Sequence, residues 1–162
     1  MKISKVRDVK SPTRGTVKSA GIDFYIPNDF IRIDLQPGYD ILIPSGIKVN
    51  VPEGYMLMAA EKSGVVTSKL AAFGAFGKVK PNAFDSIVIL GAKIIDEDYQ
   101  GEVHIHLVNV GKHVVTLEPG MKIAQFILVP VLYDRIEEVD AEVLFPSESE
   151  RGEGGFGSTD KK

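Results

Sequence analysis

The sequence contains no cysteine, which excludes disulfides, thiolate metal sites and a cysteine nucleophile. It also lacks any apolar run that approaches the ~18 residues of a membrane-spanning helix. The basic N-terminal segment has no apolar stretch of the kind that a secretory signal needs, so no signal peptide is expected. These absences favour a reducing compartment, first the cytoplasm, with a nucleus or an organelle matrix also compatible.

Neither sign of charge is in large excess, because the net charge is only −3 over 162 residues. Bulk attraction to nucleic acid is therefore not expected. The charge is unevenly spread, with six Lys or Arg against one Asp in residues 1–20, and eight acids against two Arg in residues 134–153. Imbalances of this size are usually solvated faces. With 44% hydrophobic and 25% charged residues, the composition is that of one globular domain.

Short, turn-bounded runs of β-branched residues dominate the chain. Apolar and polar residues alternate over 41–43, 47–51 and 103–107, and residues 123–131 are almost continuously apolar. This spacing predicts an all-β barrel or sandwich, with 123–131 as a strand covered on both faces. The one helix candidate, from Ser63 to about Phe73, is weak.

The familiar catalytic templates are missing, since no G-x-S-x-G, H-E-x-x-H or P-loop pattern occurs. What remains are carboxylates beside glycines. Asp23 follows Gly21, and the segment from Ile95 to Gly101 places three acids and a tyrosine between two predicted strands. Such a cluster can hold Mg²⁺ or activate water, although an acidic β-turn is the commoner interpretation.

Other patterns suit phosphate or metal. Lys62-Ser63-Gly64 opens the possible helix, where an anion site and a plain Ser N-cap are equally good interpretations. In the glycine-rich segment from Arg151, Arg and hydroxyl groups suit phosphate and an aromatic ring suits a base. His104 and His106 share one face of a predicted strand, either as metal ligands or, more commonly, as a satisfied polar pair.

Five short motifs in chain order resemble those of the trimeric dUTPase family, the deoxyuridine 5′-triphosphate nucleotidohydrolases. They are Ala20–Phe24, Lys62–Gly64, Gly91–Gly101, Gly120–Gln125 and the segment from Arg151 to the last residue. Each is weak alone, but the third and fifth, in order and at family-like spacing, are specific. The resemblance covers almost the whole chain.

The resemblance implies a distorted jelly-roll-like β-barrel subunit with at most one short helix, assembled as a homotrimer with active sites between subunits. It implies hydrolysis of dUTP to dUMP and pyrophosphate with Mg²⁺, which limits uracil in DNA and supplies dUMP for dTMP synthesis. A β domain over residues 1–147 is expected, followed by a flexible tail over 148–162 that closes the site.

The resemblance also implies a role for each matching residue. Asp96 would activate the attacking water, and Tyr99 would pack against the deoxyribose. Gly91 and Ala92 would read uracil through backbone groups. Asp23 would support Mg²⁺ indirectly, through water, with the metal held mainly by the triphosphate.

The remaining implied contacts are with phosphate and base. Phe156 in the tail would stack on uracil, and the tail would order over a neighbouring subunit's site when substrate binds. Phosphate contacts are expected on the β domain from Lys62, Ser63, Gly64 and Gln125, and on the tail from Arg151, Gly157, Ser158 and Thr159.

Four positions in the second, third and fourth motifs depart from the family pattern. Glu61-Lys62 stands where Pro-Arg is usual, and Lys122 stands where Arg is usual. Lysine cannot make the bidentate phosphate contact of arginine, so weaker phosphate binding or compensation elsewhere is expected. Lys93 replaces a usual Gly in the uracil-reading turn, where it would be strained if a positive φ is needed.

Residues 71–86 form a Gly/Ala/Phe-rich stretch longer than the family's usual connection, and a protein partner could bind there. Deleting it should leave trimers intact. Two alternatives to dUTP hydrolysis follow from these departures: a nucleotide-sensing or regulatory protein, or a hydrolase of another, modified deoxypyrimidine triphosphate.

Overall fold

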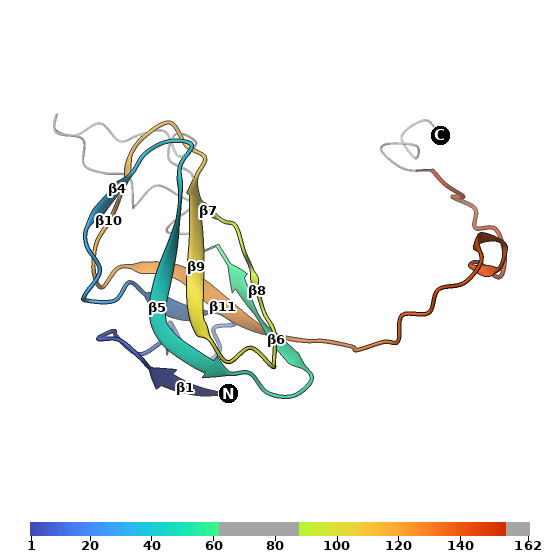
Figure 1. The fold of residues 1–162 in the computed structure, drawn as a ribbon, viewed down its shortest axis with the longest axis horizontal. Helices are drawn as coiled ribbons and strands as arrows, with labels where there is room; N and C mark the ends of the chain where they lie inside the picture. Colours follow the sequence, from blue (N-terminus) through green and yellow to red (C-terminus); the bar gives the residue numbers. More distant parts are fainter. Residues whose placement is uncertain (62–87, 155–162) are drawn as a thin grey trace. The chain divides into compact units, whose positions relative to one another are not determined.

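The structure is a computed structural model that describes residues 1–61 and 88–154. The chain divides into two units, residues 1–132 and 133–162 (Figure 1). The weak helix candidate at 63–73 and the long stretch at 71–86 lie outside the described residues, so both stay predictions.

The first unit is built from strands in the described ranges. Their bounds are β1 (Lys2–Lys5), β2 (Thr13–Arg14), β3 (Ile22–Tyr25), β4 (Ile33–Leu35), β5 (Asp40–Asn50), β6 (Tyr55–Ala60), β7 (Val88–Leu90), β8 (Ile94–Ile95), β9 (Glu102–Asn109), β10 (Val115–Leu117) and β11 (Lys122–Pro130). All of their pairings are antiparallel. The predicted all-β class is confirmed.

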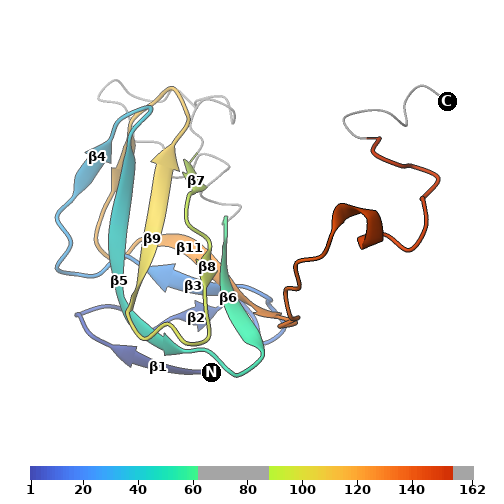
Figure 2. The ribbon, with the colours of Figure 1, turned by 45° about the vertical axis from the view of Figure 1, so that its right-hand side comes forward.

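Two larger sheets and one small pair organise these strands. The first sheet has the order β1-β5-β9-β7 and the second β2-β3-β11-β6-β8, while β10 pairs with β4. The long strands β5 and β9 run together on one side, and β3 and β11 cross behind them (Figures 1 and 2). The second sheet brings the predicted first and fourth motifs onto the neighbouring strands β3 and β11, and places part of the third motif on β8, with β6 between.

Strand alternation fills the space between the sheets. Val103, Ile105 and Leu107 are almost fully buried, whereas His104 between them faces outward. The second sheet contributes Phe24 and Phe126, whose ring centroids lie 4.4 Å apart. Burial of such side chains is the main favourable term in folding. The predicted alternation at 47–51 and 103–107 is confirmed. β11 is buried on both faces at its start, where the adjacent Ile123 and Ala124 are both buried, whereas residues 127–129 are only partly buried.

The second unit has little regular structure in its described part, residues 133–154. Its one element is a single 3₁₀ turn, η1 (Ala141–Val143), which contributes no buried residue. The large side chains Leu132, Tyr133 and Ile136 at and after the boundary are exposed. The hydrophobic core among the described residues therefore draws on the first unit alone.

Candidate functional site

The strand pairing places Asp23 and Gln125 directly opposite each other, on β3 and β11. On its other side Gln125 pairs with Ala60 of β6, and its Nε2 donates to the carbonyl of Glu61 at 2.9 Å. Gly21 makes room for this amide, because a Cβ at position 21 would lie 2.1 Å from Gln125 Oε1. Residues predicted from the first and fourth motifs are thus neighbours.

Asp23 is buried, with 4% of its surface exposed, and it is ion-paired. Lys122 Nζ donates to Asp23 Oδ2 at 2.8 Å, and this hydrogen bond is the main reason that the pKa of Lys122 is raised. The ammonium group is partly solvent-exposed and so keeps access to an anion. Burying a carboxylate is tolerated only with such a partner.

A further cation lies beside this pair. Lys10 and Lys122 both sit over the ring of Tyr25, at 4.8 and 5.7 Å from its centroid. Burial acts to raise the pKa of the Tyr25 hydroxyl, but its hydrogen bond with Thr13 and the two ammonium groups outweigh burial and lower that pKa. The two ammonium groups beside Tyr25 thus create a positive local potential, which suits a phosphate chain.

Glu61 and Lys93 form an ion pair, with 2.6 Å between Lys93 Nζ and Glu61 Oε1. Lys93 also joins the strand pairing, since its carbonyl accepts from Ala59 N at 2.6 Å. The hydrogen bond from Lys93 is the main cause of a lowered pKa of Glu61. Two of the residues that depart from the family pattern therefore contact each other. We define the strand-end cluster as Glu61, Lys93, Gln125, Asp23 and Lys122.

The turn after β8, residues 96–101, carries the other predicted carboxylates and is called the acidic turn below. Its acids have different surroundings. Glu97 accepts a hydrogen bond from Gly54 N at 2.6 Å and so anchors the turn to the β5–β6 connection. The side chain of Asp96 is exposed and makes no hydrogen bond or ion pair within the described ranges. An exposed, unpaired carboxylate can accept a proton from water.

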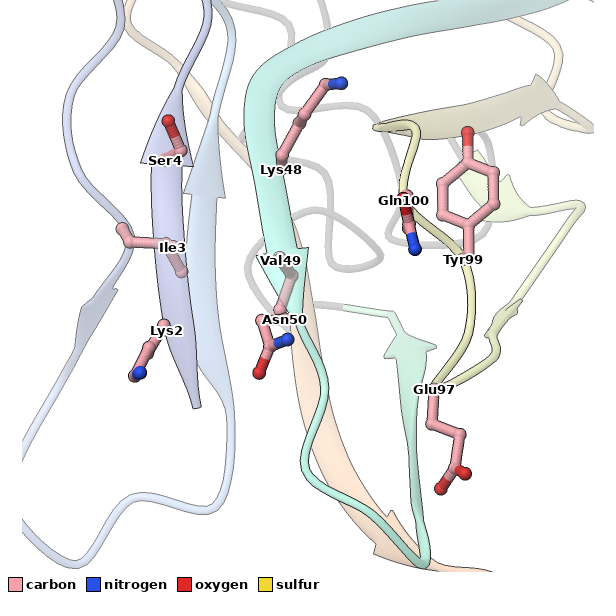
Figure 3. Close-up of a pocket in the computed structure, with 9 residues that line it drawn as sticks. All are labelled: Lys2, Ile3, Ser4, Lys48, Val49, Asn50, Glu97, Tyr99 and Gln100. Atoms are coloured by element: carbon pink, nitrogen blue, oxygen red, sulfur yellow. The ribbon is translucent and has the colours of Figure 1, made fainter.

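Tyr99 folds back over the acidic turn. Its hydroxyl donates to Glu102 O at 2.9 Å, and a Cβ at Gly101 would lie 2.3 Å from that hydroxyl oxygen. Tyr99 and Gln100 face an open cavity of about 330 Å³ that β1 and the end of β5 also line (Figure 3). The aromatic ring is 43% exposed, so one surface of it is available for packing.

Gly91 and Ala92, the predicted uracil-reading residues, are exposed and follow β7. Gly91 N donates to His106 O at 3.0 Å on β9, and the His106 ring lies over Gly91. His106 Nε2 in turn bonds Asp40 Oδ2 at 2.7 Å. Two residues along the same face of β9, His104 Nδ1 bonds Glu102 O at 2.8 Å. Each histidine thus has one ring nitrogen in a hydrogen bond within the protein, as the polar-pair interpretation predicts.

The strand-end cluster and the acidic turn are separate within one chain. Gln125 pairs with Ala60, whereas Ile95, just before Asp96, pairs with Leu57 three residues along β6. At ~3.3 Å per strand residue this offset is roughly 10 Å. No hydrogen bond or ion pair joins Asp96 or Tyr99 to the strand-end cluster over the part of the chain that the structure describes.

The described residues hold no group of three or more His, Cys, Asp or Glu that could bind a metal ion. The only described tail residue among the predicted contacts is Arg151, which is exposed and donates from Nε to Gly154 O at 2.6 Å. The structure does not describe the remaining predicted positions, Lys62, Ser63, Gly64, Phe156, Gly157, Ser158 and Thr159. Their roles stay predictions.

Fold and site together define a β-rich subunit with a strand-end cluster built on two ion pairs and a separate, exposed acid on a turn. The sequence model of the dUTPase family matches residues 79–160. A deoxyuridine 5′-triphosphate nucleotidohydrolase of Hydrogenobaculum sp. (strain Y04AAS1) is 32% identical over 162 residues, which cover 99% of this chain and 97% of the relative. The chain belongs to the dUTPase family.

Solved structures agree on the fold. A mutant dUTPase of Staphylococcus bacteriophage 80alpha, solved with dUpNHpp, superposes with a TM-score of 0.74 at 22% identity, covering 98% of this chain and 96% of that one. A mutant dUTPase of phage phi11 of S. aureus, described with a structural Mg(II) ion, gives 0.67 at 17% identity, with 86% and 95% covered. The predicted family, jelly-roll-like fold and enzyme class, a dUTP diphosphatase, are confirmed.

Sequence reasoning missed two contacts. The Glu61–Lys93 pair joins positions 32 residues apart, and only their opposite charges hinted at it. The Asp40–His106 contact joins positions 66 residues apart. For His106, the signal was present in the strand alternation, which puts it on the face of β9 that also carries His104.

In the described ranges no helix is long and apolar enough to cross a membrane.

Proposed function

We propose that this protein hydrolyses dUTP to dUMP and pyrophosphate by adding water across the α–β phosphoanhydride bond. The observation that carries the proposal is family membership together with the exposed Asp96 carboxylate on the acidic turn. The reaction removes dUTP, which limits uracil in DNA, and supplies dUMP for dTMP synthesis.

Asp96 takes a proton from the attacking water and contacts the 3′-hydroxyl of the sugar. An ionised carboxylate only accepts hydrogen bonds, so it orients a water hydrogen and receives it as the water oxygen bonds phosphorus. Tyr99 packs against the deoxyribose with its exposed ring surface and leaves no room for a 2′-hydroxyl. Gly91 and Ala92 read the base through backbone groups.

The triphosphate binds at the strand-end cluster. Gln125, Lys62, Ser63 and Gly64 contact the phosphate chain, and Lys122 adds a partly exposed positive charge. Preorganised charges of this kind are usually the largest single contribution to catalysis. Lys93 and Glu61 cancel each other's charge. Their ion pair keeps the residue that follows β6 close to the uracil-reading turn.

Mg²⁺ is the metal of this reaction, held mainly by the triphosphate. The protein's donor set fits this indirect arrangement, because the described carboxylates form no cluster that could bind a metal by themselves. Asp23, whose Oδ2 bonds Lys122, supports the metal only through water. When bound, Mg²⁺ neutralises phosphate charge and polarises the phosphoryl oxygens.

The active enzyme is a homotrimer whose sites lie between subunits. Membership of the dUTPase family supports this assembly. The tail, residues 148–162, closes over a neighbouring subunit's site. In it Arg151, Gly157, Ser158 and Thr159 hold the β- and γ-phosphates and Phe156 stacks on uracil.

Pyrophosphate release from dUTP, dTTP, dCTP and UTP, each with Mg²⁺ and then with EDTA, tests the proposal. Mg²⁺-dependent turnover of dUTP alone is expected. Turnover of a different deoxypyrimidine triphosphate would show that the pocket accepts another base and would favour the alternative hydrolase. Tight dUTP binding without turnover would instead favour a sensing or regulatory protein that uses residues 71–86 to bind a partner.

A further inference from the structure

Gly91 and His106 lie opposite each other at the end of the β7–β9 ladder. Leu90 pairs with Leu107, and Gly91 N donates to His106 O at 3.0 Å. The His106 ring fills the space where a side chain at position 91 would be. A Cβ built on Gly91 would lie 2.1 Å from His106 Nδ1 and 2.6 Å from Cε1. Gly91 therefore packs against the His106 ring at Nδ1.

Asp40 fixes the orientation of this ring. On β5, Leu42 is paired with His106, so Asp40 stands two residues along on the same face and reaches the ring diagonally. Its Oδ2 lies 2.7 Å from His106 Nε2. Because an ionised carboxylate can only accept, Nε2 carries the hydrogen of this bond. In the neutral ring, Nδ1 then keeps an acceptor lone pair beside Gly91.

Backbone groups of the turn are already partly committed. Gly91 N–H is used by His106 O, and Lys93 C=O accepts from Ala59 N. The single N–H of Gly91 therefore cannot form its best hydrogen bond with a base at the same time. Nδ1 of His106, by contrast, has no hydrogen-bond partner within residues 1–61 and 88–154. The His106 side chain is 29% exposed, so a ligand at the turn can reach it.

We propose that His106, oriented by Asp40, is a specificity-determining residue that recognises the pyrimidine ring of the substrate. Nδ1 accepts a hydrogen bond from a ring N–H, which uracil has at N3 and cytosine lacks. Cytosine presents a lone pair at N3, which opposes the lone pair of Nδ1. The inference rests on the proposed function and names a side chain that discriminates between bases beside the backbone groups.

A purely structural role for His106 predicts different behaviour. If the ring only packs on Gly91, removing it would change stability and leave the ratio of uracil to cytosine binding unaltered. The Asp40 contact provides a sharper distinction. Asn at position 40 can either accept from Nε2 or donate to it, so it permits the ring tautomer with hydrogen on Nδ1. That tautomer favours the lone pair at N3 of cytosine.

The experiment measures equilibrium binding of dUMP and dCMP by calorimetry, and turnover of dUTP and dCTP. It compares the wild type with His106→Val, Asp40→Asn and the control His104→Val. His104 lies two residues away on the same strand face and bonds only a main-chain carbonyl. For H106V we expect dUMP binding about tenfold weaker and a smaller dUMP-to-dCMP preference, the size of one hydrogen bond. H104V should match the wild type.

For D40N we expect a dUMP-to-dCMP preference several-fold lower than in the wild type, with the fold retained. If H106V fails to fold, the D40N preference decides the matter by itself. An unchanged preference in H106V or D40N overturns the inference. If the wild type binds dUMP without hydrolysing dUTP, the proposed function fails and the binding ratios still test His106. If the wild type binds neither nucleotide, both fail.

Discussion

Lys93 and Glu61 are joined by a 2.6 Å ion pair between the end of β6 and the start of β8. Each stands where the family pattern has a different residue. Lys93 has two partners: its carbonyl accepts from Ala59 N and its ammonium pairs with the Glu61 carboxylate. Removing one partner alone leaves a charge next to the triphosphate site.

A double-mutant cycle with Glu61→Gln and Lys93→Met should give a small favourable coupling free energy, below about 1 kcal/mol, because both side chains are partly exposed. Raising the salt concentration should reduce it. Urea denaturation of the four proteins at low and high salt measures the coupling. A coupling that does not change with salt would contradict an exposed ion pair.

The same pair predicts a pH dependence. Since Lys93 lowers the pKa of Glu61 from its ordinary value of 4.5, the stabilisation is fully present above that value. It is lost as the pH falls through the lowered pKa of the folded state. The difference in unfolding free energy between wild type and Glu61→Gln should therefore be constant near neutrality and shrink below about pH 4.5. A difference that grows on acidification would refute this assignment.

The Lys122–Asp23 pair predicts a loss of stability at alkaline pH, whereas the Glu61–Lys93 pair predicts a loss at acid pH. The pKa of Lys122 is raised from 10.5 by the hydrogen bond to Asp23, so its stabilisation is complete below 10.5 and disappears as the pH rises through the higher folded value. Lys122→Met should be less stable than the wild type at neutral pH because Asp23 is buried. The gap should close only above pH 10.5. Lys122→Arg, which keeps the charge, serves as the matched control.

Asp96→Asn should lower kcat for dUTP by about 10²- to 10⁴-fold, the usual contribution of a general base. The unfolding midpoint should not change, because the Asp96 side chain is exposed and makes no contact in the described ranges. Asp98→Asn, two residues along the same exposed turn, is the matched control and should keep wild-type kcat. Equal losses in both variants would mean that the turn contributes only a general negative charge.

Gly91→Ala should destabilise the fold by about 1–3 kcal/mol, because the new Cβ would meet the His106 ring held by Asp40. The double variant Gly91→Ala/His106→Ala should recover most of this loss. Adding His104→Ala to Gly91→Ala instead should recover nothing. Thermal unfolding of the single and double variants distinguishes a local clash from a backbone requirement at position 91.

Removing residues 148–162 should abolish most dUTP turnover and leave the unfolding midpoint unchanged. The described hydrophobic core uses no residue beyond Phe126, apart from the partly buried Leu128 packed against it. A tail that acts only on bound substrate therefore contributes nothing to the stability of the free protein. Loss of stability on truncation would show that the tail packs against the β domain before substrate binds.

The sequence predicted what depends on local periodicity. The alternation of Val103, His104 and Ile105 determines which face of β9 is buried, and the structure agrees. The turn that holds Asp96 was likewise predicted from its acids and glycines. These features follow from the two-residue period of a strand and from turn chemistry.

Contacts across strands could not be predicted in the same way, because register is set by the whole sheet. The pairing of Asp23 with Gln125 depends on where β11 meets β3, including a register irregularity between Lys122 and Ala124. The Asp40–His106 contact likewise needs the β5–β9 register. The resemblance to a family identified Asp23 and Gln125 as site residues, and the pairing of β3 with β11 places them side by side.

Gly54 lies in the β5–β6 connection with φ at +77°, a conformation that disfavours any residue with a side chain. Its N–H holds Glu97 of the acidic turn, and its C=O accepts from Val131 N at 2.9 Å, just after β11 ends. The main-chain groups of Gly54 thus anchor two segments: the turn that carries Asp96 and the residue that directly follows β11. A side chain at position 54 would therefore displace the acidic turn and the chain after β11 together.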